Sequence, residues 1–274
     1  MTFIPKSIGL IAGKGIYPRL TIEGARKAGV EEIVMAAFSN ETSDEVISLA
    51  DKHEVVRVGQ LGRMIKFFRK NGVNQALMAG QITPGNLFDL RPDIRTLVML
   101  GKLKRRNAES IFGAIAVELS KDGIELLPAT TFIEDALVGE GHCFGPPFSA
   151  RQIDDAHFAL GLAKQVSALD IGQSLVVRHG TVLAVEAFEG TNDCVRRGGA
   201  IGKKQALLAK VSKPNQDFRF DVPVIGPDTI RVAAEAGVMA IVLESGKTLV
   251  LDLPAVREAC DKLGVAVMGI AASD

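Results

Sequence analysis

The sequence of 274 residues contains no tryptophan and a single tyrosine, Tyr17. Proteins that bind single-stranded nucleic acid stack bases on aromatic side chains, so this scarcity argues against that class. The 32 basic and 32 acidic residues give a formal net charge of zero, which removes any overall electrostatic attraction to nucleic acid. We therefore expect no nucleic-acid partner.

Cysteine is also scarce. Cys143, Cys194 and Cys260 form no CxxC pair, which argues against a disulfide framework or a zinc cluster and fits a reducing cytoplasm. No apolar run approaches the roughly 18 residues of a membrane span, and the N-terminus lacks the layout of a signal peptide. We expect a cytoplasmic protein that is soluble or bound peripherally to a membrane.

The first half of the chain alternates short apolar runs with amphipathic stretches, as βαβ units do. We predict strands at 7–12, 32–38, 54–58 and 75–81 and helices at 18–28, 43–51 and 61–71. Gly29 and Gly72 stand where helices end, and Pro18 suits a first helical turn. This pattern indicates an α/β fold with a Rossmann-like parallel sheet.

The rest of the chain predicts a second domain. Residues 92–122 read as helical, 125–127 as a strand returning to the first sheet, and the turn-rich stretch 139–147 as a linker. Beyond it we expect helices at 149–169, 228–236 and 254–263, a hairpin within 174–188, and strands at 206–211, 238–243, 248–251 and 265–270. At about 150 residues per domain, we predict a Rossmann-like domain at 1–140 and an α/β domain with a mixed sheet at 141–274.

A glycine-rich turn follows the first predicted strand. Gly13 and Gly15 precede the helix that starts near Pro18, a context in which backbone N–H groups bind phosphate. Pro18 replaces the third glycine of the dinucleotide fingerprint, and the second strand ends without an acidic residue. The turn therefore binds a ligand or is a plain tight turn, and a nicotinamide-dependent dehydrogenase is disfavoured.

Residues 186–204 gather charges of both signs. Glu186, Glu189 and Asp193 stand close in sequence to Arg196, Arg197, Lys203 and Lys204. Carboxylates beside basic groups suit a polyphosphate that is bridged by a metal ion. The alternative is a solvated, charge-paired start of a helix.

A second charged segment spans residues 217–223. In an extended strand, Asp217, Arg219 and Asp221 share one face. Asp217 and Asp221 would then lie about 13 Å apart, too far to hold one ion together. Asp221 would stand at the end of this strand, because Pro223 has no N–H group to donate to a sheet. Farther along the chain, Asp228 is predicted to be a helix N-cap. The sequence contains no GxSxG elbow and no histidine cluster, which disfavours catalysis by a nucleophilic side chain. Metal-assisted attack by water is the remaining hypothesis. The alternative is that residues 217–223 are a strand with a solvated charged face.

A basic amphipathic stretch runs from residue 94 to 106. Lys102, Lys104, Arg105 and Arg106 stand beside apolar residues at 97, 98, 100 and 103. Such a stretch binds an anionic membrane surface or a lipid substrate. The alternative is a packed helix whose basic end is solvated.

These motifs resemble the LpxI-type UDP-2,3-diacylglucosamine pyrophosphatases of lipid A biosynthesis. The resemblance rests on residues 8–15 with Pro18, 79–81, 170–174, 185–191 with Arg196 and Arg197, 213–217 and 219–226. It implies a two-domain enzyme at the cytoplasmic face of the inner membrane that uses a divalent cation, usually Mg²⁺. The reaction it implies is hydrolysis of UDP-2,3-diacylglucosamine to UMP and 2,3-diacylglucosamine 1-phosphate, with Asp221 as the catalytic or metal-associated carboxylate.

The residue patterns and the resemblance together define a predicted site in the cleft between the domains. The catalytic residues are Asp221, Asp217 and Arg219; the substrate-binding residues are Gly13, Gly15, Gln81, Gly190, Thr191, Arg196, Arg197, Lys203 and Lys204; and the metal ligands are Asp221, Glu189, Asn192 and Asp193. Asn192 stands where the family commonly has aspartate, so Asn192 or Asp193 meets the metal. The alternative function is non-catalytic binding of a nucleotide sugar or a lipid. A second copy of the chain, in a homodimer, is a further predicted partner.

Overall fold

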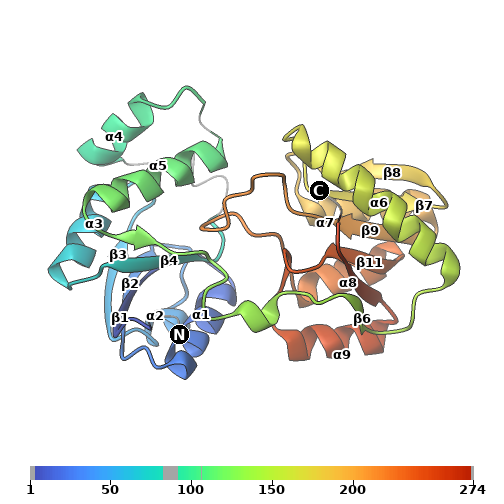
Figure 1. The fold of residues 1–274 in the computed structure, drawn as a ribbon, viewed down its shortest axis with the longest axis horizontal. Coiled ribbons are helices and arrows are strands. Elements are labelled where there is room, and N and C mark those ends of the chain that lie inside the picture. The colour runs from blue at the N-terminus through green and yellow to red at the C-terminus, as the bar shows by residue number, and fades with distance from the viewer. Residues whose placement is uncertain (1–3, 83–91, 106, 273–274) are drawn as a thin grey trace. The chain divides into compact units, whose positions relative to one another are not determined.

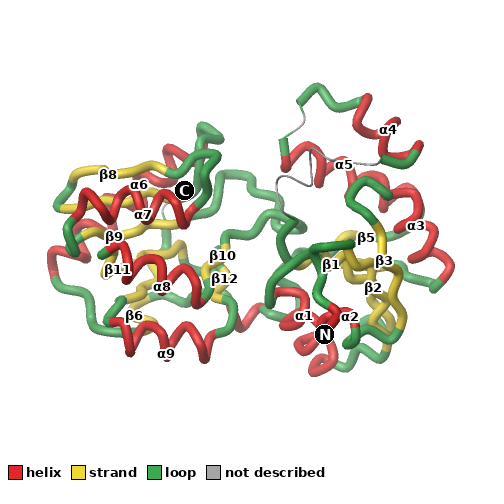
Figure 2. The backbone as a smooth tube through the Cα atoms, turned by 180° about the vertical axis from the view of Figure 1, so that it is seen from behind, coloured by secondary structure: helices red, strands yellow, loops and turns green. Residues whose placement is uncertain are grey.

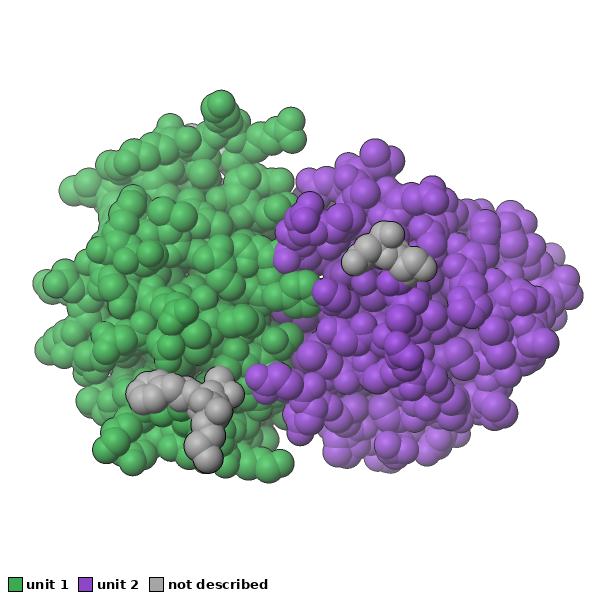
Figure 3. Space-filling model, viewed as in Figure 1, with its two compact units in different colours: residues 1–133, 217–221 green, residues 134–216, 222–274 purple. Residues whose placement is uncertain are grey.

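The computed structural model describes residues 4–82, 92–105 and 107–272 (Figure 1). Arg106, at the end of the predicted basic stretch, lies outside the described residues. The chain forms two compact units, coloured separately in Figure 3: residues 1–133 with Asp217–Asp221, and residues 134–216 with 222–274. The sequence placed the domain limit at 140/141 and gave no sign that Asp217–Asp221 joins the first unit.

The first unit holds the expected parallel sheet. Its five strands follow the order β3-β2-β1-β4-β5, and all neighbours pair in parallel. In chain order the elements are β1 (Ser7–Ala12), α1 (Tyr17–Ala28), β2 (Glu32–Phe38), α2 (Asp44–Ile47), β3 (Lys52–Val56), α3 (Leu61–Lys70), β4 (Gln75–Ala79), α4 (Ile94–Gly101), α5 (Ala108–Lys121) and β5 (Glu125–Leu126). The Rossmann-like prediction is confirmed.

Local sequence explains most of these elements. In α3 the buried residues Leu61, Met64, Ile65 and Phe68 follow the i, i+3, i+4, i+7 spacing of one helical face. Helix α1 ends at Gly29 with φ of 103°, a left-handed conformation that suits glycine. Burying one large apolar side chain such as Phe68, which is fully buried, stabilises the fold by about 1.5–3 kcal/mol.

The second unit contains a mixed sheet with the order β6-β13-β11-β9-β7-β8. Strands β9, β11 and β13 run parallel, whereas β6, β7 and β8 pair antiparallel. The elements are β6 (Gly141–Phe144), α6 (Ala150–Ala168), β7 (Ser174–Arg178), β8 (Thr181–Val185), α7 (Thr191–Gly202), β9 (Ala206–Lys210), β10 (Val224–Ile225), α8 (Pro227–Ala236), β11 (Val238–Glu244), β12 (Leu249–Val250), α9 (Leu253–Leu263) and β13 (Ala266–Ile270). Strands β10 and β12 form a separate two-stranded sheet.

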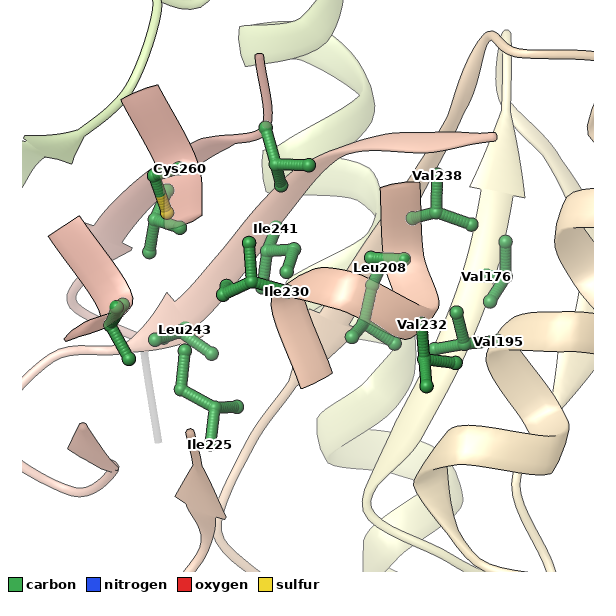
Figure 4. Close-up of a cluster of buried hydrophobic side chains, with 14 of the residues drawn as sticks. Val176, Val195, Leu208, Ile225, Ile230, Val232, Val238, Ile241, Leu243 and Cys260 are labelled. Carbon is green, nitrogen blue, oxygen red and sulfur yellow. The ribbon is translucent and has the colours of Figure 1, made fainter. Parts of the chain in front are cut away.

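Helices cover both faces of the six-stranded sheet, as the view from behind in Figure 2 also shows. Side chains of α6 pack with one set of strand residues. On the other face, residues of α7 and α8 such as Val195 and Ile230 meet Leu208 and Ile241 of the sheet (Figure 4). Ser149 caps α6 with a full capping box, as its sequence position predicts. Within the described residues, no helix is long and apolar enough to cross a bilayer.

Several local predictions were wrong. The predicted helix at 43–51 is reduced to α2, Asp44–Ile47. The proposed linker at 139–147 contains β6, an edge strand whose backbone pairs with β13. Such pairing depends on a partner distant in sequence. Helix α8 begins after Gly226, and Asp228 forms an ion pair with Arg231 instead of capping the helix.

Candidate functional site

The glycine turn after β1 lies against the end of β4. The N–H of Gly13 donates to the Ala79 carbonyl at 2.8 Å, and Lys14 and Gln81 exchange backbone hydrogen bonds at 2.8 and 3.2 Å. The sheet order reverses between β1 and β4, because β2 and β3 lie on one side and β5 on the other. Open α/β sheets bind ligands at this switch point, beyond the carboxyl ends of the strands.

The close approach of these two turns explains their glycines. A Cβ atom on Gly13 would lie 2.4 Å from the carbonyl oxygen of Gln81, so only glycine fits. Gly15 has a φ of 91° and open space around its Cβ position. Helix α1 then begins without a side-chain cap and without an acidic residue in its first turn, which leaves its N-terminal N–H groups to other acceptors. The structure thus brings together Gly13 and Gln81, two of the predicted substrate-binding residues, with Gly15 in the same turn.

The segment that carries Asp221 is a tight turn, and the prediction of an extended strand was wrong. The N–H groups of Phe220 and Asp221 both donate to the Asp217 carbonyl, at 3.2 and 3.0 Å. Asp217 and Asp221 are therefore about one helical turn apart, on the order of 6 Å, instead of the 13 Å of a strand. The N–H groups of Phe220 and Asp221 find their acceptor inside the turn, so they need no neighbouring strand.

Long-range contacts fix this turn to the first unit. The Phe218 carbonyl accepts from Ala129 N–H at 2.8 Å, and the Phe220 ring lies 5.8 Å from that of Phe112 in α5. The Ala129 carbonyl accepts from the Tyr17 hydroxyl at 2.8 Å, and burial raises the pKa of this phenol. Because Ala129 follows β5 and Tyr17 opens α1, the turn lies at the carboxyl edge of the parallel sheet.

Asp217 and Arg219 form a two-pronged ion pair within the turn. Arg219 Nε donates to Asp217 Oδ1 at 2.9 Å and Nη2 donates to Oδ2 at 2.6 Å. These hydrogen bonds lower the pKa of Asp217 and raise that of Arg219. The two predicted catalytic residues thus hold each other, which rigidifies the turn beside Asp221.

In the second unit, a polar cluster forms where α7 begins. Thr191 Oγ1 donates to Glu186 Oε1 at 2.9 Å and accepts from Lys210 Nζ at 2.7 Å. Glu186 Oε2 is buried and has no hydrogen-bond partner among the described residues. The backbone turns into α7 at Gly190, whose φ is 86°. The cluster joins the predicted residues Gly190 and Thr191 to Lys210, which the sequence prediction missed.

One feature of the sequence could have identified Lys210 as a buried charged residue. It ends the otherwise apolar strand Ala-Leu-Leu-Ala-Lys, and the structure buries it to 8% exposure. A buried lysine needs partners, because an unpaired ammonium is costly to remove from water. What the sequence could not show is that β9 ends beside the start of α7.

Two of the predicted metal-binding carboxylates, Glu189 and Asp193, lie in ion pairs with arginines. Arg197 donates to Glu189 at 2.5 Å, and Arg196 donates to Asp193 at 2.6 Å. The pKa of Glu189 is lowered by its own backbone N–H and by Arg197. The start of α7 is therefore charge-paired, one of the two alternatives that its sequence allows. In the part of the chain that is described, no group of three or more histidine, cysteine or acidic side chains is arranged to hold a metal ion.

Lys203 and Lys204 are not brought to this cluster. Both follow the last residue of α7 with positive φ values of 48° and 64°, whereas Thr191 is its first residue. A helix of 12 residues is about 18 Å long. These lysines therefore lie at the opposite end of α7 from Gly190 and Thr191.

Two solved structures show distant similarity to this chain. A CobK precorrin-6A reductase shares 15% identity, covers 98% of this chain and 88% of its own, and superposes with a TM-score of 0.30. A biotin carboxylase domain of a thermophilic 2-oxoglutarate carboxylase shares 13% identity over 63% of this chain and 35% of its own, with a TM-score of 0.27. These TM-scores are too low to support an argument about this chain.

Sequence comparison is far more specific. Residues 7–136 match the model of the LpxI N-terminal domain, and residues 139–268 match that of the LpxI C-terminal domain. A protein of Caulobacter vibrioides named UDP-2,3-diacylglucosamine pyrophosphatase LpxI is 34% identical, over 97% of this chain and 98% of its own. Both halves and nearly the full length are matched, so this chain belongs to the LpxI family.

Proposed function

We propose that this protein hydrolyses the pyrophosphate bond of UDP-2,3-diacylglucosamine in lipid A biosynthesis, releasing UMP and 2,3-diacylglucosamine 1-phosphate. The proposal rests chiefly on the nearly full-length similarity to the Caulobacter vibrioides pyrophosphatase. The turn carrying Asp221 at the carboxyl edge of the first sheet supports it, because ligands of open α/β folds bind at that edge.

We assign a divalent cation, Mg²⁺ or a similar ion, as the cofactor. Mg²⁺ is commonly held by one or two carboxylates together with substrate phosphates, so a protein cage of three ligands is not required. Asp221 is the proposed carboxylate. Glu189, Asn192 and Asp193 remain predicted ligands. When bound, the ion polarises a phosphoryl oxygen and acidifies water.

The chain's own residues supply the remaining steps. Asp221 accepts a proton from the attacking water, whose oxygen bonds to phosphorus as the bridging P–O bond breaks and its electron pair leaves with the departing phosphate. The Gly13–Gly15 turn and the N-terminus of α1 offer N–H donors to phosphate oxygens. Arg196, Arg197 and the start of α7 neutralise negative charge.

The test replaces Asp221 by asparagine, which keeps the shape of the side chain and removes its charge. Loss of a general base lowers turnover by about 10²- to 10⁴-fold. UMP release is measured with Mg²⁺ and with Mg²⁺ plus excess EDTA. Asp228→Asn is the matched control, because Asp228 is 77% exposed. Near-normal turnover of a folded Asp221→Asn protein would refute the assignment.

A non-catalytic nucleotide-sugar or lipid-binding protein is the second candidate. The arginine-bound carboxylates Glu189 and Asp193 and the neutral Asn192 favour it. Thermal-shift titration separates the two, because a binder is stabilised by ligand without Mg²⁺ and releases no UMP.

The proposed substrate is a lipid, so we propose that the enzyme acts at the cytoplasmic face of the inner membrane. Homodimerisation stays a prediction.

A further inference from the structure

Helix α4 has apolar residues on both of its faces. Thr96 and Met99 are buried, and Leu100 packs against the core of the first unit. On the opposite face, Ile94, Leu97 and Val98 are 81%, 56% and 54% exposed. Their i, i+3, i+4 spacing places them in one stripe along the helix. A surface helix ordinarily carries polar residues on that side, so the stripe requires an explanation.

The inner face of α4 is firmly attached, which holds the stripe outward. Arg95 pairs with Glu118 at 2.8 Å and with Asp122 at 2.6 Å at the α5 side. Asp93 caps α4 through Thr96 N–H at 2.9 Å and also accepts from Gly62 N–H at 2.7 Å at the start of α3. Figures 1 and 2 both show α4 at the outer edge of the first unit, beside α3 and α5. These bonds set the rotation of the helix about its axis.

A cluster of positive charge follows the stripe directly. Lys102, Lys104 and Arg105 are all exposed, and none of them forms an ion pair with another described residue. Residues 94–105 contain no acidic side chain. An outward apolar stripe flanked by lysine and arginine is the pattern of segments that lie in the interface of an anionic bilayer.

We propose that Ile94, Leu97, Val98, Lys102, Lys104 and Arg105 form a docking surface for an anionic lipid bilayer. The inference rests on the proposed function, in which the substrate is a membrane lipid. The stripe enters the boundary between headgroups and acyl chains, and the cations contact anionic headgroups. A second copy of the chain is disfavoured as occupant, because a symmetric contact would face these cations with each other.

The test is flotation of the full-length protein with vesicles of phosphatidylethanolamine and phosphatidylglycerol, compared with phosphatidylcholine alone. Wild type binds the anionic vesicles, and added salt weakens the binding. Each basic residue near the surface contributes roughly fivefold in partitioning, so Lys102→Glu/Lys104→Glu/Arg105→Glu reduces binding by about 100-fold or more. Ile94→Ser/Leu97→Ser/Val98→Ser also abolishes flotation, and far-UV circular dichroism verifies its fold.

Matched controls change exposed residues elsewhere. Lys27→Glu/Arg151→Glu/Lys262→Glu removes as much positive charge, and Leu169→Ser/Leu263→Ser removes exposed apolar side chains; both bind vesicles like wild type. UMP release from substrate in detergent micelles is unchanged in the α4 variants, whereas release from vesicles falls with binding. If neither wild type nor any variant cleaves micellar substrate, the proposed function is refuted. The docking surface is still supported in that case, provided that wild type and the controls float with anionic vesicles and the α4 variants do not.

Three outcomes overturn the docking proposal. The first is that wild type does not float with anionic vesicles. The second is that the α4 variants float as well as the controls. The third is that light scattering shows an oligomer for wild type and a monomer for the serine variant, while both proteins bind vesicles equally. The stripe would then be an interface between copies of the chain.

Discussion

Glu244→Leu is expected to destabilise the second unit strongly. Glu244 ends β11 at 3% exposure. Its Oε1 accepts from Lys164 Nζ at 2.9 Å, and its Oε2 accepts from the backbone N–H and hydroxyl of Ser212 at 2.7 and 2.9 Å. Leucine leaves the Lys164 ammonium, whose side chain is 14% exposed, without its charge partner. It also leaves the buried Ser212 N–H without an acceptor.

The structure allows the magnitude to be worked out. Removing one partner of a buried ion pair costs about 3–5 kcal/mol, because the remaining charge is uncompensated. For a domain of this size that corresponds to a fall in Tm of roughly 6 to 20 °C. Lys164→Met/Glu244→Leu removes both charges and recovers the part of the loss that comes from the unpaired charge, since apolar replacement of a whole buried pair is often neutral. The buried Ser212 N–H still lacks its acceptor in this variant.

Thermal and urea unfolding followed by circular dichroism measure both effects. Glu45→Leu is the matched control: its ion pair with Arg19 has side chains that are 73% and 46% exposed, and such pairs contribute about 0–1 kcal/mol. The reasoning is refuted if Glu244→Leu costs no more than the control, or if the double variant is as unstable as the single one.

The same variant should also slow UMP release. Ser212 directly precedes the segment that leads to the Asp221 turn, and this segment is tied down by Lys213 to Asp170 and by Gln216 to Gln173. Loss of the Glu244 contacts loosens the first of these anchors. Turnover should therefore fall in Glu244→Leu at temperatures where the protein is still folded, and it should stay low in the double variant, which also lacks the acceptor for Ser212.

Two further predictions follow from shifted pKa values. Arg219 lowers the pKa of Asp217 below its usual 3.8, so this pair stabilises the fold above about pH 4 and ceases to do so as pH falls through the lowered value. Asp217→Asn should be less stable than wild type at pH 7 in urea unfolding, with a difference that vanishes in acid; a difference independent of pH contradicts this. Burial raises the pKa of Cys194 and of Cys260 from 9.0 to about 12, so both thiols should resist maleimide at pH 8 until urea unfolds the chain. Their contribution to stability is present below pH 9 and is lost between pH 9 and 12. Rapid labelling of Cys194 or Cys260 themselves in the native protein, located by peptide mass mapping and so told apart from the half-buried Cys143, would show that they are not buried.

The sequence predicted the elements whose signals are local. Helix α3 is readable because its apolar spacing matches one helical face, and α6 because Ser149 is a residue that caps helices. The glycine turn after β1 is also readable, since Gly13 and Gly15 lie between a buried strand and a helix. Strand β6 was missed because it is turn-rich and short, and only its pairing with β13 makes it a strand.

The candidate site was predicted in part. The sequence marked Asp217, Arg219 and Asp221 as a chemical group, but the alternation that suggested a strand gave the wrong geometry. It also marked Glu189 and Asp193 without showing that arginines bind them, and it missed Lys210. In each case the deciding partner is another side chain or backbone group whose position follows from the packing of several elements.

By itself, the sequence determined the α/β class, the order of most helices and strands, and the family, because periodicity, capping residues and motifs are properties of short stretches. The tertiary structure alone decided that residues 217–221 form a turn in the first unit. That turn depends on Ala129 and Phe112, which lie far away along the chain. The exposed stripe of α4 was likewise a tertiary result, since a helix that is apolar on both faces cannot reveal from its sequence which face the fold will cover.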